Sequence, residues 1–247
     1  MSKILYFECL SGISGDMTIG SLLDLGADVE IFKQELIKLN LDGYHIEINK
    51  KSKNGIFGTK FDVILDHSHD HSHDHDHQRN YGMIKELIEA STLNEHVKQL
   101  SIDIFNEVAK AEAKIHNVSI DQVHFHEVGA VDSIVDIVGT AILIDMLNVD
   151  EIYASPIHVG TGFVKCDHGK IPVPAPATLE ILKNIPIYSK GIRSELVTPT
   201  GAAIIKVLAT EFIDRPEMII ETIGYGIATK DLEIANLLRV NLAKKKH

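Results

Sequence analysis

Six histidines alternate with aspartate and serine in an internal segment of this 247-residue chain, from Asp66 to His77. Imidazole nitrogen binds nickel, zinc and copper, and a flexible run of it can wrap an ion without a preformed cage. The alternatives are a solvated low-complexity loop and a purification tag, and a tag would not be internal or interleaved with Asp and Ser. The segment therefore predicts a disordered loop that binds a divalent transition metal through His67, His69, His71, His73, His75 and His77.

A second group of candidate ligands lies in residues 123–136. If the first five of these residues are extended, His124 and His126 share one face, roughly 7 Å apart along the strand and within reach of one ion. Asp132 and Asp136 would share one side of the very apolar helix that follows, where carboxylates are costly unless they face a site. A metal site with an acid–base member is indicated. The alternative is that Asp132 caps the helix and the histidines are structural.

Cys166 and His168, two residues apart, form a third group that could present a thiolate and an imidazole to the same ion. Such a mixed sulfur and nitrogen set suits nickel, zinc or copper. Against it, a lone cysteine is more often a small buried hydrophobic residue than a ligand. The chain has no Cys-x-x-Cys pair and no Gly-x-Ser-x-Gly motif, which excludes the zinc-ribbon and α/β-hydrolase classes.

A turn rich in glycine and serine follows the first expected strand and leads into a helix. Backbone N–H groups and the positive end of the helix dipole would then point at one spot, which suits a phosphate. The turn is neither a Walker motif nor a dinucleotide fingerprint, and the alternative is that its glycines only make a tight turn. The candidate phosphate-binding residues are Ser11, Gly12, Ser14, Gly15 and Asp16.

Hydrophobic periodicity predicts an α/β or α+β fold with a mixed sheet and flanking helices, although the topology does not follow from it. Two dipeptides add detail, because Asn54-Gly55 predicts a hairpin turn and Thr198-Pro199 a helix start. Gly224-Tyr225-Gly226 is expected to bend the last extended stretch. Strands are expected over 3–9, 44–50, 56–65, 122–128, 151–155 and 218–242, and helices over 17–26, from 28 with Asp28 as cap, 83–90, 94–117, 131–147, 176–184 and 199–212.

Composition limits the function classes. A net charge of −11 argues against a nucleic-acid partner, because no basic stripe could neutralise phosphates. The first residues lack a signal-peptide pattern and no apolar stretch reaches membrane-spanning length, so no membrane partner is expected. Two cysteines, Cys9 and Cys166, make no disulfide framework and suit a reducing compartment. A cytoplasmic protein is predicted.

Five long motifs lie in order along nearly the whole chain: Gly12–Met17, the histidine run, Val123–Gly139, Gly162–Thr178 and Glu195–Ala203. Together they resemble the LarC family of nickel-insertion proteins. The resemblance implies insertion of Ni²⁺ into pyridinium-3,5-bisthiocarboxylic acid mononucleotide, assisted by CTP with Mg²⁺ or Mn²⁺. The product would be the nickel-pincer cofactor, passed on to lactate racemase-type enzymes. His126, Glu127 or Asp132 would then be the base that removes a ring proton.

Members of that family usually continue into a further C-terminal domain. Residues 1–247 are therefore expected to be the N-terminal nickel-binding domain alone, with a flexible insertion at 66–80 and a C-terminal domain that is missing or separately encoded. Two other functions remain open: a nickel store or metallochaperone without chemistry of its own, and a metal-dependent hydrolase using His124, His126 and Asp132. The glycine turn discriminates, because only an enzyme that handles a phosphorylated substrate needs it.

Overall fold

A mixed sheet of seven strands forms one side of the molecule in a computed structural model that describes residues 2–66, 79–123, 125, 130–166 and 169–245. The strand order is β2-β3-β10-β11-β1-β4-β9. The pairs β1–β4, β4–β9 and β3–β10 are parallel and the others antiparallel, which confirms the predicted mixed sheet. The strands are β1 (Lys3–Glu8), β2 (Tyr44–Lys53), β3 (Ile56–Leu65), β4 (Glu151–Ala154), β9 (Glu211–Phe212), β10 (Met218–Ile227) and β11 (Leu237–Lys245).

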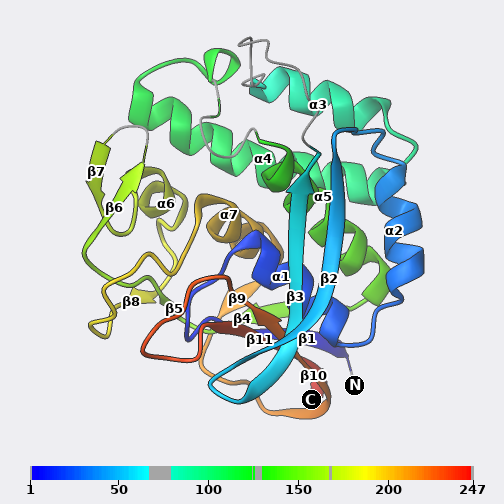
Figure 1. The fold of residues 1–247 in the computed structure, drawn as a ribbon, viewed down its shortest axis with the longest axis vertical. Coiled ribbons are helices and arrows are strands. Elements are labelled where there is room, and N and C mark those ends of the chain that lie inside the picture. The colour runs from blue at the N-terminus through cyan, green and yellow to red at the C-terminus, as the bar shows by residue number, and fades with distance from the viewer. Residues whose placement is uncertain (1, 67–78, 124, 126–129, 167–168, 246–247) are drawn as a thin grey trace.

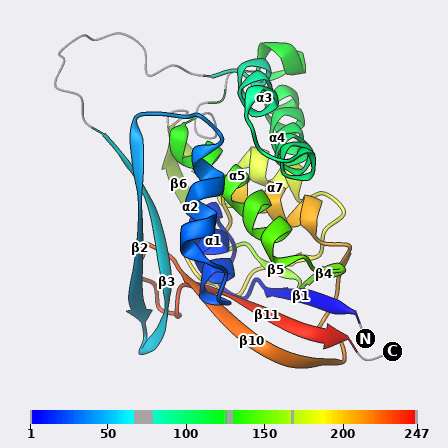
Figure 2. The same ribbon diagram turned by 90° about the vertical axis from the view of Figure 1, so that its right-hand side faces the viewer.

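The helices pack on the inner face of this curved sheet, as Figures 1 and 2 show. α1 lies against β10 and β3, α5 lies against α1, and α4 covers α5 on the side away from the sheet. The helices are α1 (Gly15–Asp24), α2 (Val29–Ile37), α3 (Tyr81–Ala90), α4 (Glu95–His116), the 3₁₀ helix η1 (Ile120–Gln122), α5 (Val131–Leu147), α6 (Pro176–Ile181) and α7 (Pro199–Leu208). Two small two-stranded sheets pair β5 (Ile157–His158) with β8 (Ile187–Tyr188) and β6 (Phe163–Cys166) with β7 (Gly169–Pro172).

The predicted bend at Gly224-Tyr225-Gly226 is wrong, because all three residues lie inside β10 and pair with β11. The glycines are needed for a different reason. A Cβ on Gly226 would lie 1.8 Å from the Met17 carbonyl oxygen, and one on Gly224 would lie 2.1 Å from the Ser21 carbonyl oxygen. Only glycine lets the backbone of α1 approach the strand this closely. The two glycines in this stretch therefore mark a close contact between a helix and a strand, and not a bend.

The β2–β3 hairpin is attached to β10 through Asp24 at the end of α1. One carboxylate oxygen of Asp24 accepts a hydrogen bond from Thr59 Oγ1 at 2.7 Å, and the other accepts one from the Tyr225 backbone N–H at 2.9 Å. Since a single residue pair, Gly226 with Thr59, links β3 directly to β10, this side chain supplies much of the polar connection. It fixes β3 beside α1.

α5 matches its predicted bounds and is buried along most of its length, with a left-handed Asn148 ending it. Its N-cap is Ala130, whose side chain makes no capping hydrogen bond, so the alternative in which Asp132 caps the helix is wrong. Asp132 lies in the first helical turn, where its negative charge faces the positive end of the dipole.

Other predicted bounds need correction, because the stretch expected to be extended over 218–242 is two antiparallel strands, β10 and β11. α1 begins two residues early, with Ser14 and not Asp16 as N-cap. Asp28 and Thr198 cap their helices through side-chain oxygens, as predicted, and Asn94 also caps α4 in this way. α6 ends at Ile181 and α7 at Leu208, because the predicted end of α7 includes strand β9. Gln122, expected to be extended, belongs to η1.

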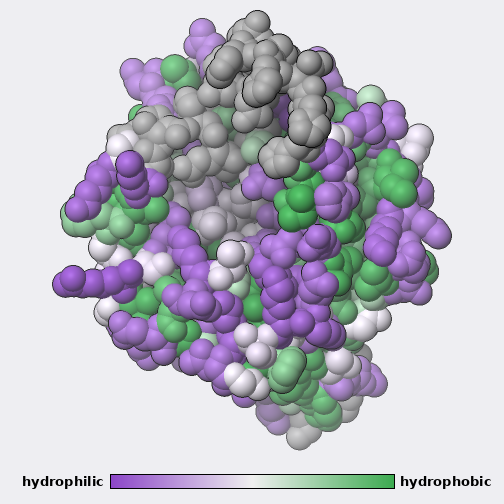
Figure 3. All heavy atoms as spheres, viewed as in Figure 1, coloured by the Kyte–Doolittle hydropathy of each residue, from purple (hydrophilic) through white to green (hydrophobic). Residues whose placement is uncertain are grey.

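Hydrophilic side chains cover most of the face that Figure 3 shows, especially over β2 and β3, and hydrophobic ones appear beside α2. Ile31 and Ile37 on α2 are 48% and 75% exposed. Scattered apolar side chains of this kind are common on protein surfaces and identify no partner. Within the described ranges, no helix has the length and apolar character needed to span a bilayer.

Candidate functional site

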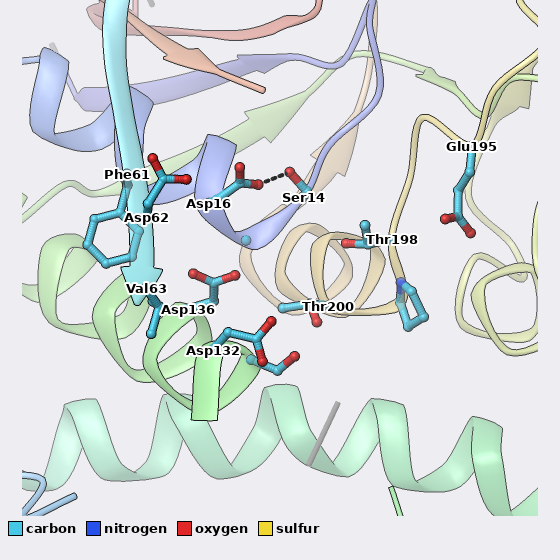
Figure 4. A pocket seen from close by; sticks show the side chains of 13 residues that line it. Ser14, Asp16, Phe61, Asp62, Val63, Asp132, Asp136, Glu195, Thr198 and Thr200 are labelled. Carbon is cyan, nitrogen blue, oxygen red and sulfur yellow. Dashed lines mark hydrogen bonds between the residues drawn. The ribbon is translucent and has the colours of Figure 1, made fainter. Parts of the chain in front are cut away.

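A cavity of about 350 Å³ opens where α1 and α7 begin, beside the first turns of α5 and the middle of β3. Its volume is in the range of small-molecule sites. Figure 4 shows four aspartates, Asp16, Asp62, Asp132 and Asp136, on one side of the cavity, with Glu195 on the opposite side. The lining residues are Ser14, Gly15, Asp16, Phe61, Asp62, Val63, Asp132, Ser133, Asp136, Glu195, Thr198, Pro199 and Thr200.

Backbone hydrogen bonds between two loops bring the starts of α1 and α7 to this cavity. The Ile13 N–H donates to the Leu196 carbonyl oxygen at 3.0 Å, and the Thr198 N–H donates to the Ile13 carbonyl oxygen at 3.2 Å. A Cβ on Gly12 would lie 1.8 Å from the Leu196 carbonyl oxygen, so the approach of the loops requires glycine. The N-termini of α1, α5 and α7 therefore surround one volume, and their dipoles favour the carboxylates there.

Lys60 holds two of these carboxylates from β3. Its side chain is buried, and Nζ lies 2.7 Å from Asp16 Oδ2, 2.8 Å from Asp62 Oδ1 and 2.9 Å from the Phe61 carbonyl oxygen. An ammonium has three donors, and these three acceptors use them all. Burial lowers the pKa of Lys60, but Asp16 and the hydrogen bonds to Asp16 and Asp62 outweigh burial and hold the pKa above its ordinary value. The ammonium stays charged.

Asp136 lies deepest among the acidic side chains, against the first turn of α1. A Cβ on Gly15 would lie 2.3 Å from Asp136 Oδ2, so only glycine leaves room for the carboxyl group. The Asp16 backbone N–H donates a hydrogen bond to Asp136. Burial raises the pKa of Asp136 well above its usual range, the charges of Asp16 and Asp132 raise it further, and Lys60 opposes them only in part. A carboxyl group whose pKa is raised holds a proton more readily than an ordinary aspartate and can act as an acid–base group.

Five of the residues singled out in the sequence meet at this cavity: Ser14, Gly15, Asp16, Asp132 and Asp136. They come from two motifs more than a hundred residues apart, which the sequence treated as separate sites. Ser11 and Gly12 do not line it, since Ser11 Oγ donates to the Ala235 carbonyl oxygen at 2.9 Å and Gly12 packs on Leu196.

The remaining predicted ligands and bases lie outside the described residues. Cys166 ends β6, but its side chain is also outside them. Over the described part of the chain, no group of three or more His, Cys, Asp or Glu side chains could hold a metal ion. The nickel-site assignments therefore stay predictions. The residues outside are His67, His69, His71, His73, His75, His77, His124, His126, Glu127 and His168.

Sequence reasoning missed Lys60, Asp62 and Glu195. Lys60 and Asp62 are alternate residues of a strand whose neighbours Phe61 and Val63 are apolar, and two charges in such a strand signal a polar site. Glu195 lies in the Glu195–Ala203 motif, but its spacing from other acids gave no sign of a shared cavity. Each of the three residues stands out in the sequence, but the sequence does not show which other residues share its cavity.

Two reactive side chains away from the cavity are structural. Cys9 is fully buried, and burial followed by the charge of Glu8 raises the pKa of its thiol to about 12. His158 is buried between the Leu10 carbonyl oxygen and the Lys190 N–H, each 3.0 Å from a ring nitrogen, and its ring stacks on Tyr188. Neither is available as a nucleophile or ligand.

Residues 5–247 match the profile of a family described as "Nickel insertion protein". The chain belongs to the nickel insertion protein family. It is 53% identical over 99% of its length to the "Pyridinium-3,5-bisthiocarboxylic acid mononucleotide nickel insertion protein" of Acetivibrio thermocellus. Proteins with the same description from Clostridium kluyveri and Geobacillus kaustophilus are 53% and 50% identical over 98% of the chain. The predicted LarC resemblance is thereby confirmed.

The chain spans 61%, 62% and 60% of the lengths of these three curated relatives. What their names say of a mononucleotide substrate describes longer proteins of the nickel insertion family. No solved structure matches the chain.

Proposed function

We propose that this member of the nickel insertion family inserts Ni²⁺ into pyridinium-3,5-bisthiocarboxylic acid mononucleotide to form the nickel-pincer cofactor. The observation that carries the proposal is the acidic cavity at the start of α1, which gathers Asp16, Asp62, Asp132 and Asp136 in a volume of about 350 Å³. Carboxylates attract a divalent ion and a cationic pyridinium ring. Relatives at about 50% identity carry this substrate in their names.

The chemistry requires a base. Nickel must bind two thiocarboxylate sulfurs and a ring carbon, and that carbon loses its hydrogen as a proton when the nickel–carbon bond forms. We assign this proton to His126, Glu127 or Asp132, as the sequence predicted, and Asp132 lines the cavity. Asp136 lies one helical turn further on, and its raised pKa suits a group that relays the proton.

Nickel is the substrate metal, and we assign its collection to the run from His67 to His77. Its delivery ligands would come from His124, His126, Asp136, Cys166 and His168. Ser14, Gly15 and Asp16, with Ser11 and Gly12 behind them, would hold the phosphorylated end of the mononucleotide at the start of α1.

The lyase-type activity would be assisted by CTP with Mg²⁺ or Mn²⁺ and would pass its product to a nickel-pincer-dependent enzyme. Among the described residues that line the acidic cavity there is no lysine or arginine to neutralise a triphosphate. CTP would therefore bind outside this cavity, and a C-terminal domain supplied with this chain is the candidate for its binding.

Single substitutions test the assignment. H126A, E127A and D132A should each abolish cofactor maturation, while full activity in all three would exclude the proposed base. Deleting residues 66–77 should raise the nickel concentration needed without removing the chemistry. A folded but inactive deletion variant would instead place the histidine run in the active site, and nickel binding without affinity for the mononucleotide would favour a nickel store.

A further inference from the structure

A second, smaller cavity of about 150 Å³ adjoins the larger one on the other side of the α1 turn. The two cavities share Ser14, Asp16, Glu195 and Thr198 as a common wall. The smaller one is completed by Met17 and Leu196 and by the segment after β10, through Ala228, Thr229, Lys230 and Asn236. The two volumes therefore lie side by side at the start of α1, within reach of one elongated ligand.

We propose that the smaller cavity binds the phosphate of the mononucleotide and that Lys230 is its charged ligand. This inference rests on the proposed function, which supplies the substrate. It goes further because it states how the bound substrate is oriented. The pyridinium ring lies in the larger cavity and the phosphate lies between Lys230 and the start of α1.

The charges of the two cavities support this direction. The larger cavity carries Asp16, Asp62, Asp132, Asp136 and Glu195 and, among its described lining residues, no lysine or arginine. Lys60, behind that wall, has all three donors committed. A phosphate there would meet net negative charge, whereas nickel and the pyridinium nitrogen would be attracted. The smaller cavity is less acidic, because of its two acids Asp16 is paired with Lys60, and the Lys230 ammonium balances the charge of Glu195.

The backbone at Lys230 is held by side chains from elsewhere, so the position of the residue is built into the fold. Asn236 Nδ2 donates to the Lys230 carbonyl oxygen at 2.9 Å, and Lys53 Nζ lies 3.4 Å from the same oxygen. Lys53 also donates to the Thr229 carbonyl oxygen at 3.2 Å and pairs with Asp231. Asp231, the nearest acid in sequence, is thus neutralised by Lys53. The Lys230 ammonium makes no hydrogen bond or ion pair within the described part of the chain.

Two ligands that differ only in the phosphate test the inference. Dissociation constants are measured by calorimetry for pyridinium-3,5-bisthiocarboxylic acid mononucleotide and for the riboside that a phosphatase makes from it. The 247-residue chain should bind the mononucleotide more tightly. K230Q should lose about tenfold in affinity for the mononucleotide and should bind the riboside unchanged, because a charge-assisted contact to the phosphate is lost. K230R should keep most of the affinity.

K85Q is the matched control, because Lys85 is an exposed lysine on α3 that pairs, among the residues described, with Glu89 in the next turn. It should bind both ligands as the unmodified chain does. Equal binding of the mononucleotide by K230Q and the unmodified chain would overturn the inference, and so would an equal loss for both ligands. Binding of neither ligand by the unmodified chain would overturn the proposed function and this inference with it.

Discussion

The Lys60 ammonium on β3 lies 2.7 Å from Asp16 Oδ2 in the first turn of α1 and 2.8 Å from Asp62 Oδ1 on its own strand. One buried cation thus joins the sheet to the helix whose N-terminus forms the cavity. Two of the four aspartates are held by it, while Asp132 and Asp136 on α5 lie outside its hydrogen bonds. The fold therefore offsets part of the negative charge of this acidic wall with one buried ammonium.

Replacing Lys60 by methionine should destabilise the protein by about 1–3 kcal/mol, because it leaves Asp16 and Asp62 without their cation in a partly buried place. The full cost of a broken buried pair is not expected, since both aspartate side chains keep 27% of their surface exposed. Urea unfolding measures the change. K51M is the control: Lys51 is more than half exposed and 4.0 Å from Asp62, so its loss should change stability by less than about 0.5 kcal/mol. Equal effects of the two variants would contradict the role given to Lys60.

Asp136→Asn should stabilise the metal-free protein at neutral pH, because the folded state raises the pKa of this carboxyl group and so disfavours its charged form. Each unit by which the pKa is raised costs about 1.4 kcal/mol of stability above that pKa. The penalty vanishes below about pH 4, where the unfolded chain also binds the proton, so the gain should shrink as the pH falls. Denaturant unfolding at pH 7.5 and at pH 4 measures the gain in stability at each pH. A variant that is less stable than the unmodified chain at both pH values would contradict the raised pKa.

Gly226→Ala should destabilise the protein by about 3 kcal/mol or more, since its Cβ would lie 1.8 Å from the Met17 carbonyl oxygen and α1 would have to move off β10. Thermal and urea unfolding measure the loss. Gly82→Ala, in α3, is the matched control. The nearest atom to its Cβ would be the Asn80 side-chain oxygen at 3.3 Å, and alanine is the better helix former, so stability should change little or rise. A tolerated Gly226→Ala would contradict the close packing of α1.

The sequence predicts those helices and strands that have a clear hydrophobic periodicity or a local cap or turn signal. α5, α2 and the β2–β3 hairpin follow from apolar spacing, Asp28 as cap and Asn54-Gly55 as turn. Gly224 and Gly226 were misread because a glycine in a strand can mean a bend or a close backbone approach, and only the position of α1 decides between them.

The sequence predicted two parts of the candidate site but not that they form one cavity. The turn before α1 and the acidic side of α5 each had a local signal, but their meeting depends on how α1 packs between α5 and β10. Lys60 lay outside both motifs, and its role follows from a contact between β3 and Asp16 in the first turn of α1. Long-range contacts of this kind have no local pattern in a sequence.

Glu8 should give acid sensitivity. It is buried at the end of β1, where Arg239, Asn241 and Arg215 donate hydrogen bonds to its carboxylate. Burial raises the pKa of Glu8, but the hydrogen bonds from Arg239 and Asn241 outweigh burial and hold the pKa below its ordinary value. Because the folded pKa is lowered, this stabilisation is complete above about pH 4.3 and is lost as the pH falls through the folded pKa.

Glu8→Gln should therefore cost about 1–3 kcal/mol at pH 7, and the difference from the unmodified chain should shrink as the solution becomes more acidic. Unfolding measured between pH 7 and pH 3 gives the curve. Glu30→Gln, with its carboxylate 74% exposed beside Lys33 on α2, serves as control and should change stability by less than about 0.5 kcal/mol throughout. A difference for Glu8→Gln that grows towards acid pH would reverse the sign predicted here.

The most direct test is to incubate the purified, metal-free chain with Ni²⁺ and pyridinium-3,5-bisthiocarboxylic acid mononucleotide, with and without CTP, and to follow the absorption spectrum and mass of the product. The proposed function predicts the nickel complex, with the mass of one nickel gained and one ring hydrogen lost. Nickel uptake without that product in either arm would contradict it and would mean that these residues only load the metal.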